Sequence, residues 1–316
     1  MSWGVLLLLV IGGLLSVQAA ANVQLSRATS SPLGASTLQL AIGSVVLLAA
    51  TVALGATGVL GLLADVPIAH LLGGIGSAVY ITAGILLFPR LGAVVTTGLF
   101  IAGQMLASLV LDSFGLLGVV RAELDWSAAV GVLAVLAGAA AIVQANASVP
   151  VRVPSGAPGP QVPSARGARP GWLAFAVLGG AVLPVQGAIN ARLRADLGAP
   201  LAVSAVSFVL ATAVMAGLLA AAVVAGRTHR PRWTGAALPW WGWLGGVIGA
   251  AYVTSVFLLI PELGAAATIA LTVAGQQLAG VAVDHFGLLR MARRPVSRYR
   301  LAGVVVLLAG VAVLQW

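Results

Sequence analysis

Long apolar blocks, separated by short polar breaks, restrict the fold of this chain more than any other feature of its sequence. An α-helix of about 20 apolar residues crosses the roughly 30 Å hydrocarbon core of a bilayer, and most of the blocks have about that length. Of the 316 residues, 60% are hydrophobic and only 7% are charged, whereas soluble domains carry about 25% charged residues. We therefore predict an all-α integral membrane protein with ten transmembrane helices.

Prolines lie near the ends of several of these blocks, where a proline starts a helix well and interrupts one badly. The expected helices cover residues 3–23, 34–56, 67–88, 92–111, 127–146, 171–190, 200–225, 240–260, 264–283 and 301–316. The stretch 149–170 holds six prolines among glycine and serine, so we interpret it as a flexible linker. It divides the chain into residues 1–148 and 171–316, with five expected helices in each part.

The two parts of the chain repeat one another. Four positions, Gln18, Asn22, Leu25 and Pro32, recur 168 residues later, and after the next loop the offset becomes 172. Matched pairs are Gln18 and Gln186, Asn22 and Asn190, Pro32 and Pro200, Tyr80 and Tyr252, Gln104 and Gln276, and Asp112 and Asp284. Such residues rarely align by chance in an apolar sequence, which indicates an internal duplication. Because five is an odd number, the second copy would enter the membrane upside down, giving two inverted five-helix repeats.

Charge placement predicts the orientation and excludes some functions. All 16 basic residues are arginine; thirteen lie in loops expected on one side of the membrane and three, Arg121, Arg192 and Arg194, on the other. Arginine is enriched in cytoplasmic loops, so we expect the linker inside and both termini outside. No basic stripe with interleaved aromatic residues occurs, which argues against nucleic-acid binding. The chain contains no cysteine, so it has no disulfide and no thiolate metal site.

Three segments of the sequence resemble a known transporter family. They are Leu183-Pro-Val-Gln-Gly-Ala-Ile-Asn-Ala-Arg-Leu193, Ala274-Gly-Gln-Gln-Leu278 and Asp284-His-Phe-Gly-Leu288. Together they resemble the YdcZ-like branch of the drug/metabolite transporter (DMT) superfamily in a fused two-repeat form, over nearly the whole chain except the linker. In the first half, Ser16-Val-Gln-Ala-Ala-Ala-Asn22 keeps the Gln and Asn but lacks the preceding Pro. The resemblance implies small-molecule transport by alternating access, with export as the usual assignment. Ten-helix relatives usually have cytoplasmic termini, opposite to the orientation that the arginine count predicts.

Amide and phenol side chains within the expected helices form the candidate site. Residues four apart share one face of a helix, as in the pair Gln18 and Asn22 and its repeat. A buried amide at membrane depth needs a partner, which is either a residue on a neighbouring helix or a substrate in a cavity. Both interpretations stay open. The predicted substrate-binding residues are Gln18, Asn22, Tyr80, Gln104, Gln186, Asn190, Tyr252 and Gln276.

The expected function is that of a secondary transporter in the cell membrane, exporting a small polar or amphipathic molecule. No ionisable residue is expected in the middle third of any span, which disfavours cation exchange on a membrane-embedded carboxylate and favours a neutral or zwitterionic substrate. An integral membrane enzyme acting on lipid, with Asp284 and His285 as its only candidate pair, is one alternative, and a passive channel is another. We expect no cofactor and no metal. The expected partners are the substrate and the lipid bilayer, and a homodimer stays open.

Overall fold

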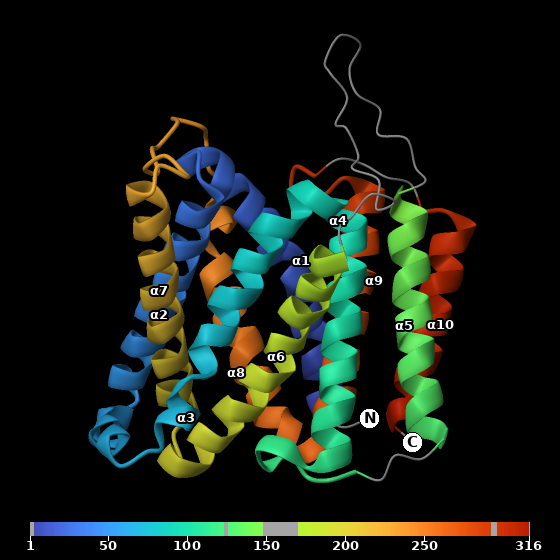
Figure 1. Ribbon diagram of the computed structural model, residues 1–316, viewed down its shortest axis with the longest axis horizontal. Coiled ribbons are helices and arrows are strands. Elements are labelled where there is room, and N and C mark those ends of the chain that lie inside the picture. Colours follow the sequence, from blue (N-terminus) through green and yellow to red (C-terminus); the bar gives the residue numbers. More distant parts are fainter. Residues whose placement is uncertain (1–2, 123–125, 148–169, 292–295, 316) are drawn as a thin grey trace.

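The computed structural model describes residues 3–122, 126–147, 170–291 and 296–315, in which every regular element is a helix (Figure 1). The longer helices are α1 (Trp3–Thr29), α2 (Pro32–Ala53), α4 (Gly73–Phe114), α5 (Trp126–Ala147), α6 (Pro170–Leu197), α7 (Pro200–Val224), α8 (Gly245–Leu263), α9 (Ala265–Phe286) and α10 (Arg298–Gln315). The short elements are η1 (Ala56–Ala64), α3 (Ile68–Leu71), η2 (Leu116–Gly118) and η4 (Trp240–Trp243). The prediction of an all-α chain is confirmed for these residues.

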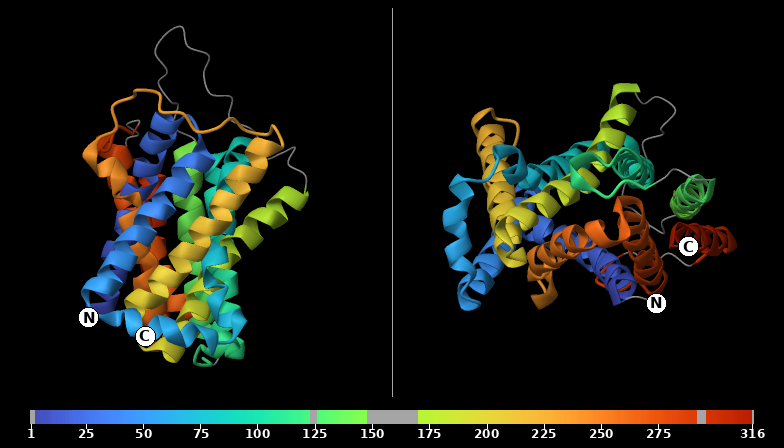
Figure 2. Two further views of the ribbon diagram at one scale, coloured as in Figure 1. Left: turned by 90° about the vertical axis from the view of Figure 1, so that its left-hand side faces the viewer. Right: turned by 90° about the horizontal axis from the view of Figure 1, so that it is seen from below.

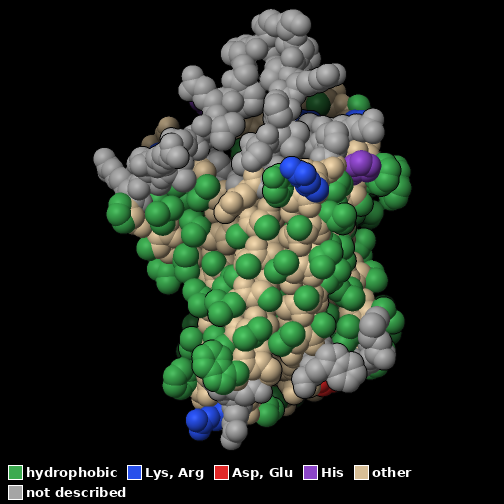
Figure 3. All heavy atoms as spheres, turned by 90° about the vertical axis from the view of Figure 1, so that its right-hand side faces the viewer, with side chains coloured by type: hydrophobic (Ala, Val, Ile, Leu, Met, Phe, Trp, Pro, Cys, Tyr) green, Lys and Arg blue, Asp and Glu red, His purple; other side chains and the backbone are tan. Residues whose placement is uncertain are grey.

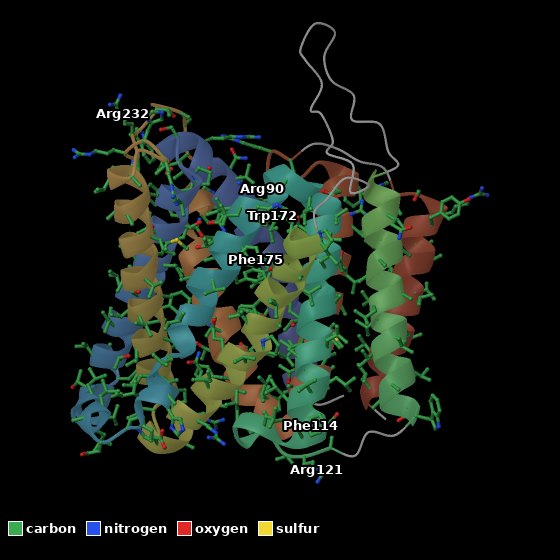
Figure 4. All side chains as sticks on the ribbon, in the orientation of Figure 1. Arg90, Phe114, Arg121, Trp172, Phe175 and Arg232 are labelled. Atoms are coloured by element: carbon green, nitrogen blue, oxygen red, sulfur yellow. The ribbon has the colours of Figure 1, made fainter. Side chains whose placement is uncertain are left out.

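The helices have the length and surface of membrane spans. Among the described residues, seven helical segments are long and apolar enough to cross a bilayer, and Gly73–Leu87 and Trp126–Ile142 are shorter apolar helices. The face drawn in Figure 3 carries hydrophobic side chains along its whole length, with basic side chains near both ends and a histidine side chain near one end. Figure 4 places Arg90 and Arg232 at one end of the bundle and Arg121 at the other. This distribution is typical of an integral membrane protein.

The structure corrects the boundary between the third and fourth predicted helices. Residues 67–88 and 92–111 were expected as separate spans, but α4 is continuous over 42 residues, preceded by the short α3. A straight helix of that length would measure about 63 Å, twice the thickness of the hydrocarbon core. Figure 1 shows that α4 instead rises through the bundle, bends and returns. Arg90 lies at the bend, next to Pro89, and proline kinks a helix because it lacks an N–H donor.

Other predicted ends shift for local reasons. Pro32 and Pro200 begin α2 and α7 as expected, while the preceding helices α1 and α6 run on to Thr29 and Leu197. The Ser31 hydroxyl accepts a hydrogen bond from the Gly34 backbone N–H at 3.0 Å and so caps α2. The expected helix 240–260 is divided into η4 and α8. The predicted linker lies outside the described residues, apart from Pro170 at the start of α6.

Helices from the two halves of the chain pack against each other in pairs. The main pairs are α1 with α9, α4 with α6, α2 with α7, and α5 with α10. Each pair takes one helix from residues before the linker and one from residues after it. The end-on view in Figure 2 shows α5 and α10 side by side at one edge of the bundle. Contacts between the halves therefore form much of the interior.

Glycines allow the close approach of α5 and α10. A Cβ atom on Gly138 would lie 2.6 Å from the Gly303 carbonyl oxygen, and one on Gly303 would lie 2.9 Å from that of Gly138. Gly131 and Gly310 face each other in the same way, at 3.1 and 2.8 Å. Backbones this close leave no room for a side chain, which is the common form of helix pairing in lipid. Because one sequence number rises as the other falls, the two helices are antiparallel.

Leucine at position 138 is expected to separate these helices. The added side chain would meet Gly303 and Leu307 of α10, and such overpacking costs about 1–3 kcal/mol. Thermal unfolding of the purified protein in detergent should therefore occur at a lower temperature for Gly138→Leu. Gly217→Leu on α7 is the matched control, because a Cβ there has no heavy atom within 4 Å. Equal unfolding temperatures for the two variants would contradict the packing described here.

Candidate functional site

The two amides of α6 are buried against the start of α4 and against α7. Gln186 is 3% exposed, and its Oε1 atom accepts a hydrogen bond from the Ser77 hydroxyl at 3.0 Å. Asn190 is fully buried, and its Nδ2 atom donates to the Ser207 hydroxyl at 3.1 Å. A Cβ on Gly76 would lie 2.9 Å from the Gln186 Cβ, so glycine at this position lets α4 approach the amides. These two amides therefore join helices across the interior.

The equivalent amides of α1 are more open. Gln18 is half-buried, and a Cβ on Gly249 of α8 would lie 2.7 Å from its Nε2 atom. Gly249 is related to Ser77 by the 172-residue offset, so the two glutamines contact equivalent positions of the two halves. Asn22 is also half-buried, and its Oδ1 atom is inaccessible and has no hydrogen-bond partner among the described residues. An unpartnered acceptor of this kind is costly unless water or a ligand satisfies it.

The two predicted site tyrosines occupy equivalent positions of the repeat on α4 and α8. Tyr80 packs its ring on Phe100, with 4.8 Å between the ring centroids, and Tyr252 on α8 is 8% exposed. Tyr252 follows Gly249 by three residues and Tyr80 follows Ser77 by three, so each tyrosine lies about one turn from an amide contact. Tyr80 therefore lies near the α6 amide contact on α4, and Tyr252 lies near the α1 amide contact on α8.

Gln104 and Gln276 are positioned by their helix backbones. Gln104 is 6% exposed and lies in the part of α4 after the bend. Its backbone carbonyl oxygen accepts a hydrogen bond from the Ser108 hydroxyl at 2.7 Å. Gln276 is half-buried on α9, and its backbone carbonyl oxygen accepts a hydrogen bond from the Ser16 hydroxyl of α1 at 3.0 Å. In the described part of the chain, no hydrogen bond joins either side-chain amide to the other six predicted site residues. Their role in substrate binding stays a prediction.

Two further polar side chains lie near this site and were not predicted. Gln39 of α2 is 4% exposed; its Nε2 atom donates to the Gly242 carbonyl at 3.4 Å, and its Oε1 atom is buried without a partner in the described residues. The Thr82 hydroxyl is likewise buried and unpartnered there. Gln39 precedes Ser207, the partner of Asn190, by 168 residues, so the repeat offset could have identified it.

Asp112 links the end of α4 to the start of α9. Its carboxylate accepts hydrogen bonds from the backbone N–H groups of Ala265 at 2.7 Å and Ala266 at 2.6 Å. The residue before α9 is Gly264, which has no side chain to cap the helix, so Asp112 caps it from another helix. A pocket of about 120 Å³ lies beside this carboxylate, between α4, α5, α9 and α10.

Asp284, the counterpart of Asp112, has a different partner. Its carboxylate pairs with the Arg300 guanidinium of α10 at 2.8 Å, and the Arg300 side chain is only 3% exposed. The position equivalent to Arg300 in the first half is Ala128, which lines the pocket beside Asp112. The first half therefore leaves space where the second half holds a buried cation. His285 accepts a hydrogen bond at Nδ1 from the Val296 backbone N–H at 3.1 Å.

Loss of the Asp112 carboxylate should destabilise the protein. Asp112→Ala leaves two N–H groups at the start of α9 without their acceptor, and hydrogen bonds to a charged group contribute about 1.5–3 kcal/mol each. We expect a lower free energy of unfolding, by about 3 kcal/mol, in a denaturant titration in mixed micelles. The exposed Asp65 provides the control, since Asp65→Ala should change little. An Asp112→Ala protein as stable as the wild type would refute the capping role.

These observations define a multi-pass membrane protein with polar side chains at the contacts between its halves. A family model described as "Putative inner membrane exporter, YdcZ" matches residues 3–141 and again residues 171–313. The chain therefore belongs to the YdcZ family of the DMT superfamily, a family of exporters of the cell inner membrane, in a form that carries two copies of the family unit. It is a membrane transporter, as the resemblance predicted.

A solved structure supports the fold. A protein known from a crystal structure matches 98% of this chain and 94% of its own length, with a TM-score of 0.66 at 17% sequence identity. At this identity the likeness concerns the fold alone. No protein with a curated description matches the sequence.

Proposed function

We propose that this protein is a secondary transporter that moves a small polar or amphipathic molecule by alternating access, in the direction of export. Two inverted five-helix repeats, residues 1–148 and 171–316, would form it, joined by the linker 149–170. In transporters of this type, the substrate site lies near the middle of the membrane where the repeats meet, and each side of the membrane reaches it in turn.

The reciprocal contacts between α5 and α10 carry this proposal. An offset of 172 relates Gly131 to Gly303 and Gly138 to Gly310. If each residue is replaced by its equivalent in the other half, the contact between Gly131 and Gly310 becomes a contact between Gly303 and Gly138. Both contacts are present in the structure. Only a two-fold operation has this property, and between antiparallel helices its axis is perpendicular to them. For helices that cross the membrane, such an axis would lie in the membrane plane, which supports the inverted duplication proposed here.

A second contact supports the same axis near the candidate site. The hydroxyl groups of Ser44 on α2 and Thr212 on α7 are hydrogen-bonded to each other at 2.9 Å, and these residues are 168 apart, the offset of the first part of the repeat. A pair of equivalent residues can contact each other only close to the axis that relates them. The axis would then pass between α2 and α7 and, further along, between α5 and α10.

The substrate would bind where amides and phenols of the two halves converge. We assign substrate contact to Gln18, Asn22, Tyr80, Gln104, Gln186, Asn190, Tyr252 and Gln276. Neutral donors and acceptors of this kind can satisfy a polar substrate without a buried countercharge. The open side of Gln18 and the Oδ1 atoms of Asn22 and Asn190, which have no partner among the described residues, would bind the substrate, since Gln186 Oε1 and Asn190 Nδ2 already have partners.

A transport assay with a mixed panel of substrates tests the proposal. Proteoliposomes loaded with radiolabelled neutral and zwitterionic compounds, such as amino acids and betaine, would be diluted into buffer with and without a proton gradient. At least one compound should leave proteoliposomes faster than it leaves protein-free liposomes, and its rate of release should differ between the conditions with and without the proton gradient. Equal release from both kinds of liposome across the panel would overturn the transport function for this substrate class.

Cysteine labelling tests the arrangement in the membrane. Because the chain has no cysteine, Arg121→Cys and Arg232→Cys each introduce a single thiol at opposite ends of the bundle. In whole cells, an impermeant maleimide should label Arg121→Cys and not Arg232→Cys if the termini lie outside. The opposite pattern would reverse the proposed orientation. Labelling of both from outside would contradict a membrane-spanning bundle.

A further inference from the structure

An apolar groove on the outside of the bundle lies between α4 and α6. Its volume is about 430 Å³, and it continues down to η2. Its lining is entirely hydrophobic or glycine: Gly103, Leu106, Ala107, Val110, Leu111, Leu116, Leu117, Val177, Ala181 and Val185. Leu106 and Val110 on its rim are 49% and 46% exposed, so the groove opens toward the surrounding lipid. None of the predicted substrate-binding residues lines it.

The length of the groove along α6 is comparable to the depth of one leaflet. At Gly103, α4 touches the backbone of α6 at Val177, which closes one end of the groove. Toward η2, at the other end of the groove, the lining continues with Leu111, Leu116 and Leu117. From Val177 to Val185 the helix rises about 12 Å, close to the ~15 Å depth of one hydrocarbon leaflet. An acyl chain entering from η2 could therefore fill it.

Two arginines flank η2 at the open end of the groove. A Cβ on Gly118 would lie 3.0 Å from the Nε atom of Arg192, so the Arg192 side chain lies against η2. Arg121 follows η2, and its Nε atom donates to the Ser113 carbonyl at 3.2 Å. Both side chains are exposed, and neither forms an ion pair with an acidic side chain of the described residues. Both cations therefore lie beside η2 with no acidic partner among the described residues.

We propose that this groove is a binding site for an anionic phospholipid of the leaflet on the side of the termini. One acyl chain would occupy the groove, and the lipid phosphate would bind Arg192 and Arg121. Lipid tails are as apolar as the groove, so hydrophobicity alone gives no preference over bulk lipid. Selectivity would come from the guanidinium groups, which form paired, charge-assisted hydrogen bonds with phosphate oxygens. The acyl chain of the lipid would fill the groove and give its lining side chains van der Waals contacts that they otherwise lack.

Native mass spectrometry of the protein released from lipid nanodiscs tests this site. Nanodiscs of equal parts phosphatidylcholine and phosphatidylglycerol would supply the two lipids. The wild type should retain one phospholipid, with phosphatidylglycerol enriched about tenfold. Arg192→Gln should remove the enrichment. The matched control, Arg230→Gln in the exposed loop before α8, should keep it.

Filling the groove provides the second arm of the test. Ala181→Trp should lower retention of either lipid several-fold, whereas Leu133→Trp, at a 64% exposed position on α5, should not. Equal amounts of the two lipids on the wild type would overturn the proposal, as would full retention by Ala181→Trp. Loss of the bound lipid on adding inorganic phosphate would also overturn it, because the site would then recognise the free anion. If Ala181→Trp does not fold, the comparison of Arg192→Gln with Arg230→Gln decides.

Discussion

Gln276→Leu is expected to reduce transport by about tenfold or more while leaving thermal stability unchanged. The Gln276 side chain is half-buried, and the hydrogen bond that ties this position to Ser16 uses the backbone carbonyl, which leucine retains. The substitution therefore removes an amide that could bind substrate and keeps the packing of α1 on α9. Initial rates of release from proteoliposomes, compared with unfolding temperatures of the same preparations, would measure both effects.

The matched comparison is Gln186→Leu. That change removes the acceptor of the Ser77 hydroxyl in a position that is 3% exposed, so it should lower stability together with transport. Comparing the transport rate and the unfolding temperature of the two variants distinguishes a residue that binds substrate from one that only joins helices. If Gln276→Leu loses stability in step with its transport rate, Gln276 contributes to packing and its place in the substrate site is wrong.

Asp284→Ala should cost about 3–5 kcal/mol of unfolding free energy, because it leaves the Arg300 guanidinium buried without its counterion. Two nitrogen atoms of Arg300, Nε and Nη1, already lack a hydrogen-bond partner among the described residues, so the carboxylate is its main stabilising contact. A denaturant titration in mixed micelles would measure the loss. Asp65→Ala, at an exposed carboxylate, should change the free energy by less than about 0.5 kcal/mol.

The double variant Asp284→Ala/Arg300→Met distinguishes the cause of this loss. Methionine keeps much of the apolar volume of arginine and removes the charge, so the double variant should be more stable than Asp284→Ala alone. The difference between the double variant and the sum of the single variants gives the coupling energy of the pair. A double variant that is no more stable than Asp284→Ala would show that the lost stability does not come from an unpaired arginine.

Much of the fold could be predicted because the bilayer imposes a simple pattern on the sequence. Apolar blocks and terminal prolines gave α2, α5 and α7 nearly as found, and the repeat of Gln18 at Gln186 anticipated a family unit that matches twice. The continuity of α4 was missed because Pro89 ends one apolar block, and hydropathy does not distinguish two helices from one bent helix. The number of spans and the inverted relation of the halves stay proposals.

Contacts between helices were harder to predict than the helices. The pairing of Asp284 with Arg300, and the cap that Asp112 gives to α9, depend on helix rotation and on distances between segments far apart in sequence. Amides at membrane depth could be identified as residues that need partners. Which partner each would have could not, so Gln186 and Gln276 appeared alike in the sequence and differ in the structure.

The packing of α1 on α9 also constrains how the protein is made. Ser16 and its partner Gln276 are 260 residues apart, so α1 enters the membrane long before the helix that covers its glycine face has been synthesised. Until α9 is inserted, the glycine face of α1 is in contact with lipid. The same holds for α5 until α10 has been synthesised and inserted. In a protein with only one five-helix unit, a second copy of the protein inserted in the opposite orientation would have to supply the helices that cover these glycine faces.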